Sequence, residues 1–216
     1  FWPGVPPSSA RRSLRQALYF LARAGGEGIL ETAGDQVRFC PDDCAIDSRR
    51  FEQALAEHRY EDAAGLYTGP FLDGWDPGRS RELRHWIDSV RERLAVGYRQ
   101  ALRKCARDAL ANQHPVKAVE CARLAVGAFP LDDSVHALLL ESLVAAGRPG
   151  EAVREYEAYR VLLREELDDL PSETVTEIGE RARQLVLEQG SVPESGGDAA
   201  QPVPISAAPM DPIPDR

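Results

Sequence analysis

The chain has 216 residues, of which 43% are hydrophobic and 28% charged, and its formal net charge is −9. This length accommodates one large or two small domains. The sequence has no secretory signal and no run of about 18 apolar residues, which favours a soluble cytoplasmic protein over a secreted or membrane-spanning one.

The charge is unevenly distributed along the chain. Residues 1–40 hold five arginines against three acidic residues, which gives +2, whereas residues 190–216 carry −3 and the stretch between them carries −8. A contact with nucleic acid is therefore expected in the N-terminal segment, and the acidic middle suits a protein partner.

Residues 9–21 are predicted to form an amphipathic helix. Its apolar face has the i, i+3, i+4, i+7 spacing, at Leu14, Ala17, Leu18 and Leu21. The opposite side gathers basic and polar side chains, namely Arg11, Arg12, Arg15, Gln16 and Tyr19. Arginine and glutamine pair bidentately with guanine and adenine edges, and arginine also holds phosphates, so this side indicates a DNA recognition helix. The alternative is an ordinary solvated basic face.

A β-hairpin is predicted directly after this helix. Two short runs, Ile29–Thr32 and Gln36–Phe39, flank a Gly34-Asp35 turn. A recognition helix followed by a hairpin is the C-terminal half of a winged helix-turn-helix, in which the helix enters the major groove and the hairpin reaches the backbone or the minor groove. The alternative is a plain β-turn connector.

The predicted winged helix is incomplete. A helix-turn-helix core needs at least three helices, and only one precedes this hairpin. The chain begins at Phe1, without an initiator methionine. We therefore interpret residues 1–40 as the C-terminal part of such a domain in a fragment of a longer protein.

The middle of the chain is predicted to be a helical repeat array. Ala111–Val119 aligns with Ala145–Val153 at an offset of 34 residues, which is the period of tetratricopeptide repeats. Stacked helix pairs of this kind form a concave surface that suits another chain, although the array could also be a packed spacer. The other expected elements are helices over 48–57, 60–67, 80–111 and from about 173 to 189, and a loop over 71–77.

Three further features limit the chemistry. Residues 190–216 are rich in Ser, Pro, Gly and Ala, which predicts a disordered tail or linker. The four cysteines lack the usual zinc spacings and are predicted to be structural free thiols, at Cys40, Cys44, Cys105 and Cys121. Phosphate-binding loops and hydrolase or metalloprotease motifs are missing from the sequence. The histidines are scattered along the chain, at His58, His85, His114 and His136. Neither an enzymatic activity nor a bound metal or cofactor is therefore expected.

Four groups of residues together resemble a known family. They are Trp2-Pro3 with 10–18; Tyr67–Trp75 with His85-Trp86 and 91–94; Pro130–Asp133 with His136 and Leu138–Leu140; and Gly147-Arg148, Ala152, Tyr156, 162–167 and 171–174. This pattern resembles the Streptomyces antibiotic regulatory protein family, bacterial activators in which a winged helix precedes a tetratricopeptide-like bacterial transcriptional activator domain. The chain departs from the family at Asp168, where a glycine is usual.

The resemblance implies a mainly α fold, with a tetratricopeptide-like helical domain over 47–189 after a partial winged helix (one helix plus a β-hairpin) over 1–40, and a linker over 190–216. It implies a transcriptional activator whose partners are double-stranded promoter DNA, RNA polymerase and a second copy, with no membrane. The residues implied to contact DNA are Arg11, Arg12, Ser13, Arg15, Gln16, Tyr19 and Arg38, with Asp35 and Gln36 near the wing tip. The alternative is a tetratricopeptide-type interaction scaffold in which the N-terminal segment packs on the repeats and does not bind DNA.

Overall fold

The computed structural model describes residues 4–25, 29–34, 36–39, 46–78 and 80–190. It is mainly helical and has one two-stranded sheet among these residues, as the sequence predicts. None of the described helices is both long and apolar enough to cross a membrane.

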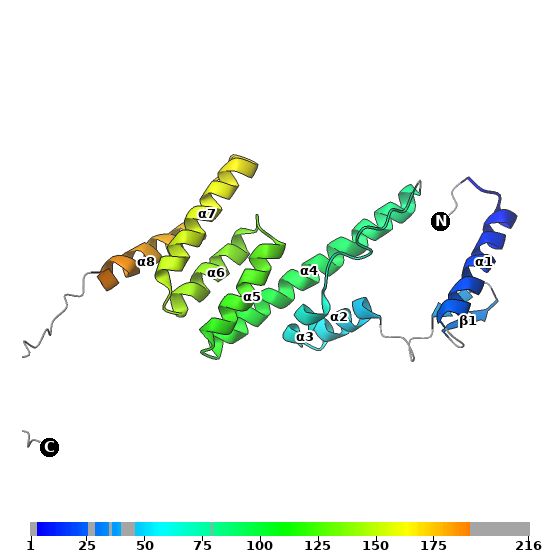
Figure 1. Cartoon of the computed structure of the whole chain (residues 1–216), viewed down its shortest axis with the longest axis horizontal. Coiled ribbons are helices and arrows are strands. Elements are labelled where there is room, and N and C mark those ends of the chain that lie inside the picture. Colours follow the sequence, from blue (N-terminus) through cyan, green and yellow to red (C-terminus); the bar gives the residue numbers. More distant parts are fainter. Residues whose placement is uncertain (1–3, 26–28, 35, 40–45, 79, 191–216) are drawn as a thin grey trace, which may run out of the picture.

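The N-terminal part consists of one helix and a hairpin. Helix α1 spans Pro7–Gly25, and strands β1 (Leu30–Ala33) and β2 (Gln36–Phe39) pair antiparallel. Helix α1 is longer than predicted at both ends. Its first residue is a proline, whose missing N–H is not needed at that position. Neither α1 nor the hairpin packs extensively on helices α2 to α8 (Figure 1).

Seven helices form the array that follows. They are α2 (Asp47–Ala56), α3 (Tyr60–Leu66), α4 (Arg81–Ala111), α5 (Pro115–Ala128), α6 (Asp133–Ala145), α7 (Pro149–Leu167) and α8 (Glu173–Gly190). Three successive units, α2–α3, α4–α5 and α6–α7, are stacked side by side, and α8 packs on α6 and α7 (Figure 1). The long helix α4 contacts α2, α3, α5 and α6, and so belongs to two unit interfaces.

The same turn joins the two helices of each unit. Its central residue has a left-handed backbone, and the next N–H donates to the carbonyl five residues earlier, at 2.8–2.9 Å. These central residues are His58 (φ 58°), Gln113 (φ 61°) and Gly147 (φ 71°). The sequence repeat located the second and third turns. It missed the first, because Tyr60 stands where Pro115 and Pro149 begin the other second helices.

Small residues let the paired helices approach closely. An alanine five positions after each turn is fully buried, at Ala63, Ala118 and Ala152. The largest core cluster is formed by residues of the five helices from α4 to α8, and it includes the leucines of α6. Helix α8 closes this core with Val175 and Ala182. Most of its outward side chains are polar, as expected for a terminal helix, although Leu187 near its end is 72% exposed.

Two sequence features have a structural explanation. Asp168, at the position of the family's glycine, is the C-cap of α7 and has a left-handed backbone with φ 52°. Cys105 and Cys121 are buried free thiols, and burial raises the pKa of Cys121 to about 12. Both therefore behave as structural cysteines, whereas Cys40 and Cys44 lie outside the described residues.

Candidate nucleic-acid interface

A straight stripe of side chains runs along α1 at steps of four residues. Residues four apart on a helix lie above one another on one face, so the predicted Arg11, Arg15 and Tyr19 are neighbours. All three are exposed. The stripe continues to Arg23, whose Nη1 donates to the Tyr19 hydroxyl at 3.5 Å. Arg23 was not among the predicted residues, although the same four-residue spacing could have identified it.

The other predicted residues of α1 flank this stripe. Arg12 and Gln16 are exposed, and Ser13 is half-buried. On the apolar side, Ala17 and Leu18 are half-buried, whereas Leu14 and Leu21 are 42% and 57% exposed. The described residues therefore cover this side of α1 only in part.

The hairpin presents Arg38 and Gln36 to solvent. Arg38 lies directly opposite Glu31 in the antiparallel register, and opposite residues share one face of the sheet. Arg38 therefore has an acidic cross-strand neighbour, whereas helix α1 contains no acidic residue. Asp35, predicted near the wing tip, lies outside the described residues.

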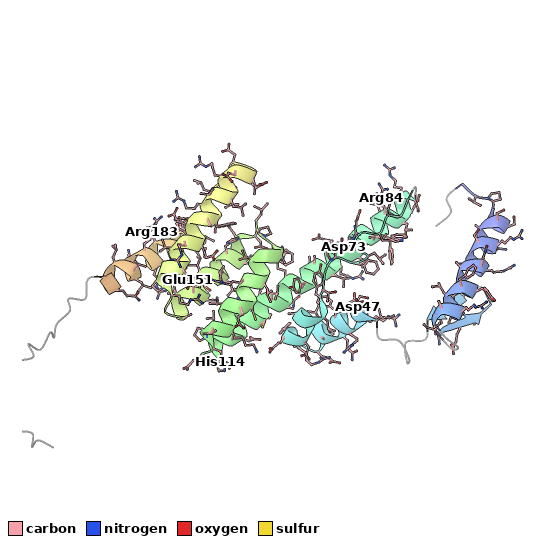
Figure 2. The ribbon with its side chains drawn as sticks, in the orientation of Figure 1. Asp47, Asp73, Arg84, His114, Glu151 and Arg183 are labelled. Carbon is pink, nitrogen blue, oxygen red and sulfur yellow. The ribbon has the colours of Figure 1, made fainter. Side chains whose placement is uncertain are left out.

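The arginines of α1 differ from those of the array in their partners. Within the described residues, every ion pair lies in the part of the chain from α2 to α8. Arg123 pairs with Glu151, for example, and Arg183 pairs with glutamates of α7 and α8; Figure 2 shows Glu151 and Arg183 in the packed C-terminal half of the array. The guanidinium groups of Arg11 and Arg15 have no such partner among the described residues, and so can bind an external anion.

His136 occupies a packed site and not a reactive one. Its Nε2–H donates to the Pro130 carbonyl at 2.8 Å, and its ring stacks on Tyr159. Burial lowers the pKa of His136, so the neutral ring is favoured. The described residues also contain no group of three or more His, Cys, Asp or Glu side chains placed to hold a metal ion.

The comparisons with known proteins concern mainly the array. The family model described as the bacterial transcriptional activator domain matches residues 43–183. No curated protein matches the sequence. Among solved structures, Mycobacterium tuberculosis EmbR in complex with a low affinity phosphopeptide is similar, with a TM-score of 0.54 and 20% identity. The match covers 85% of this chain and 52% of that one, so the chain spans about half of the EmbR chain, and at this identity the likeness shows the fold alone.

Proposed function

Because the chain belongs to the bacterial transcriptional activator domain family, we propose that it regulates transcription by binding promoter DNA through α1 and the hairpin. The observation that carries this proposal is the exposed stripe of α1, whose arginines have no ion-pair partner among the described residues. The family model describes a transcriptional activator domain and not an enzyme, which agrees with a role in binding.

The geometry of α1 supports entry into the major groove. A helix fits this groove, which is about 12 Å wide, and there Arg15 and Gln16 can pair with base edges. Arg11 and Arg12, one turn earlier, are suited to phosphates, which fix the register of the helix without reading sequence. In this proposal Arg38 on the hairpin supplies a further backbone contact, and Tyr19, on the same stripe of α1, faces the groove.

The array is proposed to carry the protein contacts of the regulator. The stretch between residues 40 and 190 has a net charge of −8, which disfavours a phosphate backbone and leaves its stacked units for a protein surface. RNA polymerase and a second copy of the chain are the partners proposed. A second copy would place two α1 helices on DNA and fits binding to repeated half-sites.

The test is a fluorescence anisotropy titration of the full-length gene product with DNA from the neighbourhood of its own gene, at two salt concentrations. Sequence-selective binding that weakens steeply as salt rises is expected, because arginine contacts to phosphates release counterions. Absence of binding at low salt would overturn the proposal and favour the interaction scaffold. A matched DNA of scrambled sequence separates selective from general binding.

A further inference from the structure

An open groove of about 720 Å³ lies where the connector between α3 and α4 meets α4 and the C-terminal end of α5. Its walls carry large apolar and aromatic side chains, namely Tyr67, Pro70, Tyr98, Leu124 and Phe129. Small residues also line it, including Ala95 and Gly127. Leu124 is 57% exposed, so the groove offers apolar surface to solvent.

Two stacked tyrosines line one side of the groove. The ring centroids of Tyr67 and Tyr98 are 4.2 Å apart with 14° between the planes, and Phe129 lies 6.3 Å from Tyr98. Neither tyrosine hydroxyl makes a hydrogen bond to another described residue. Burial raises the pKa of both phenols, which keeps their protons in place as donors. Each hydroxyl can therefore donate to a carbonyl of a bound chain.

Both arginines that line the groove are already engaged. Arg91 donates to the carbonyls of Phe71 and Leu72, each at 2.8 Å, and Arg123 pairs with Glu151 at 2.9 Å. The aromatic faces, the two hydroxyls and the carboxylate of Glu92 are therefore the groups left for recognition. Aromatic walls with hydroxyl donors suit the polyproline II helix, whose carbonyls are unpaired and whose shape is fixed before binding.

We propose that this groove binds a proline-rich extended segment and that its occupant is residues 200–216 of the same chain. The stretch 191–216 contains six of the sixteen prolines, and Pro209 and Pro212 are three residues apart, one turn of a polyproline II helix. The 18 residues that precede Pro209 in this stretch span up to about 56 Å at roughly 3.1 Å each. That reach exceeds the length of α4, about 46 Å for 31 residues, so Pro209 and Pro212 can return from Gly190 to the groove.

The first test is photo-crosslinking in the full chain, with p-benzoylphenylalanine in place of Leu124. The expected product is a crosslink within one chain to residues 200–216, identified by mass spectrometry and lost when Pro209 and Pro212 are replaced by serine. The same photoreactive residue in place of Val161, which is 55% exposed on α7, is the control and should not reach this segment. Crosslinks between two copies, or crosslinks unaffected by the proline replacements, would overturn the assignment.

The second test uses a labelled peptide of residues 200–216 and a full chain in which the five prolines from 202 to 214 are replaced by serine. The peptide should bind this chain, and Tyr98→Phe should raise its Kd about 2- to 10-fold through loss of one hydrogen bond. Tyr60→Phe, outside the groove, is the matched control and should leave Kd unchanged. An equal Kd for the Tyr98→Phe chain would contradict the proposal. Neither test depends on DNA binding.

Discussion

The ring of His136 lies face to face on that of Tyr159, with 3.6 Å between centroids and 13° between planes. Each ring also bonds a different part of the chain. His136 donates to Pro130 in the α5–α6 connector, and the hydroxyl of Tyr159 donates to Asp133 at 2.5 Å. Asp133 in turn accepts from the Ser172 N–H in the α7–α8 connector. This pair therefore fixes how the second unit, the third unit and α8 are joined.

Removing the Tyr159 hydroxyl tests how much its hydrogen bond to Asp133 contributes to the free energy of unfolding. Tyr159→Phe keeps the stacked ring but removes a hydrogen bond to a charged acceptor, and should lower the free energy of unfolding by about 1–3 kcal/mol. Urea denaturation followed by circular dichroism measures this change. Tyr60→Phe removes an exposed hydroxyl that contacts His58, and should cost under about 0.5 kcal/mol. Equal losses in the two variants would show that the Asp133 contact adds nothing.

The buried imidazole predicts how stability depends on pH. Burial lowers the pKa of His136 below its ordinary 6.5, against opposing effects of the Pro130 carbonyl and of the carboxylates of Glu155, Asp133 and Asp132. As the pH falls, His136 of the unfolded chain therefore binds a proton before His136 of the folded chain does. The contribution of the neutral His136 ring to stability is complete above the pKa of the unfolded chain and is lost as pH falls through the pKa of the folded chain.

Denaturation at several values between about pH 7.5 and 5 should therefore show a decline in the free energy of unfolding. His136→Gln should flatten that decline, whereas His85→Gln, at an exposed position, should leave it in place. A decline of the same size in the His136→Gln chain would assign the pH dependence to other groups.

The packing of α8 depends on a glycine. A Cβ built at Gly179 would lie 2.6 Å from Cγ of Tyr156, closer than real side chains approach. Gly179→Ala should therefore force α8 away from α7 and lower the melting temperature, at a cost of about 1–3 kcal/mol. In contrast, a Cβ at Gly65 in α3 meets nothing within 4 Å, so Gly65→Ala should be neutral or slightly stabilising. An unchanged melting temperature of the Gly179→Ala chain would show that Tyr156 can move aside without cost.

Asp168 is a site where the chain can be made more stable. Its left-handed backbone is strained for a side chain and free of strain for glycine, so Asp168→Gly should raise the free energy of unfolding by about 0.5–1 kcal/mol. Glu166→Gly, two residues earlier and inside α7, should lower it by about 1 kcal/mol. Urea titrations of the two variants should therefore shift in opposite directions, and shifts of one sign would refute the cap argument.

The α1 stripe predicts the effect of one arginine on DNA affinity. Arg15→Ala in the full-length gene product should weaken specific binding by about 1–3 kcal/mol, because a bidentate base contact is lost. Arg49→Ala, an exposed arginine of α2, should leave affinity unchanged within about twofold, since it lies off the stripe. Anisotropy titrations at one fixed salt concentration give both values. Unaltered binding by the Arg15→Ala chain would remove this residue from the proposed interface.

Local patterns were sufficient to predict much of this fold. The helix and hairpin at the N-terminus, the long helix near residues 80–111 and two of the three unit turns follow from periodicity and from prolines at helix starts. The first unit was not recognised as a repeat because Tyr60 lacks that proline signal. The exposure of Leu14, and the partners of Tyr159 and Arg91, depend on residues distant in sequence, which a local pattern does not specify.

Helix α4 also has a mechanical consequence. It belongs to the second unit and also packs on α2 and α3 of the first, and its one glycine, Gly97, is covered by Phe51 and Leu55. A continuous helix without proline bends little, so there is no hinge between the first and second units. A displacement of α2 and α3 is therefore transmitted through the continuous helix α4 to α5 and α6. The first two units consequently move together as one rigid body.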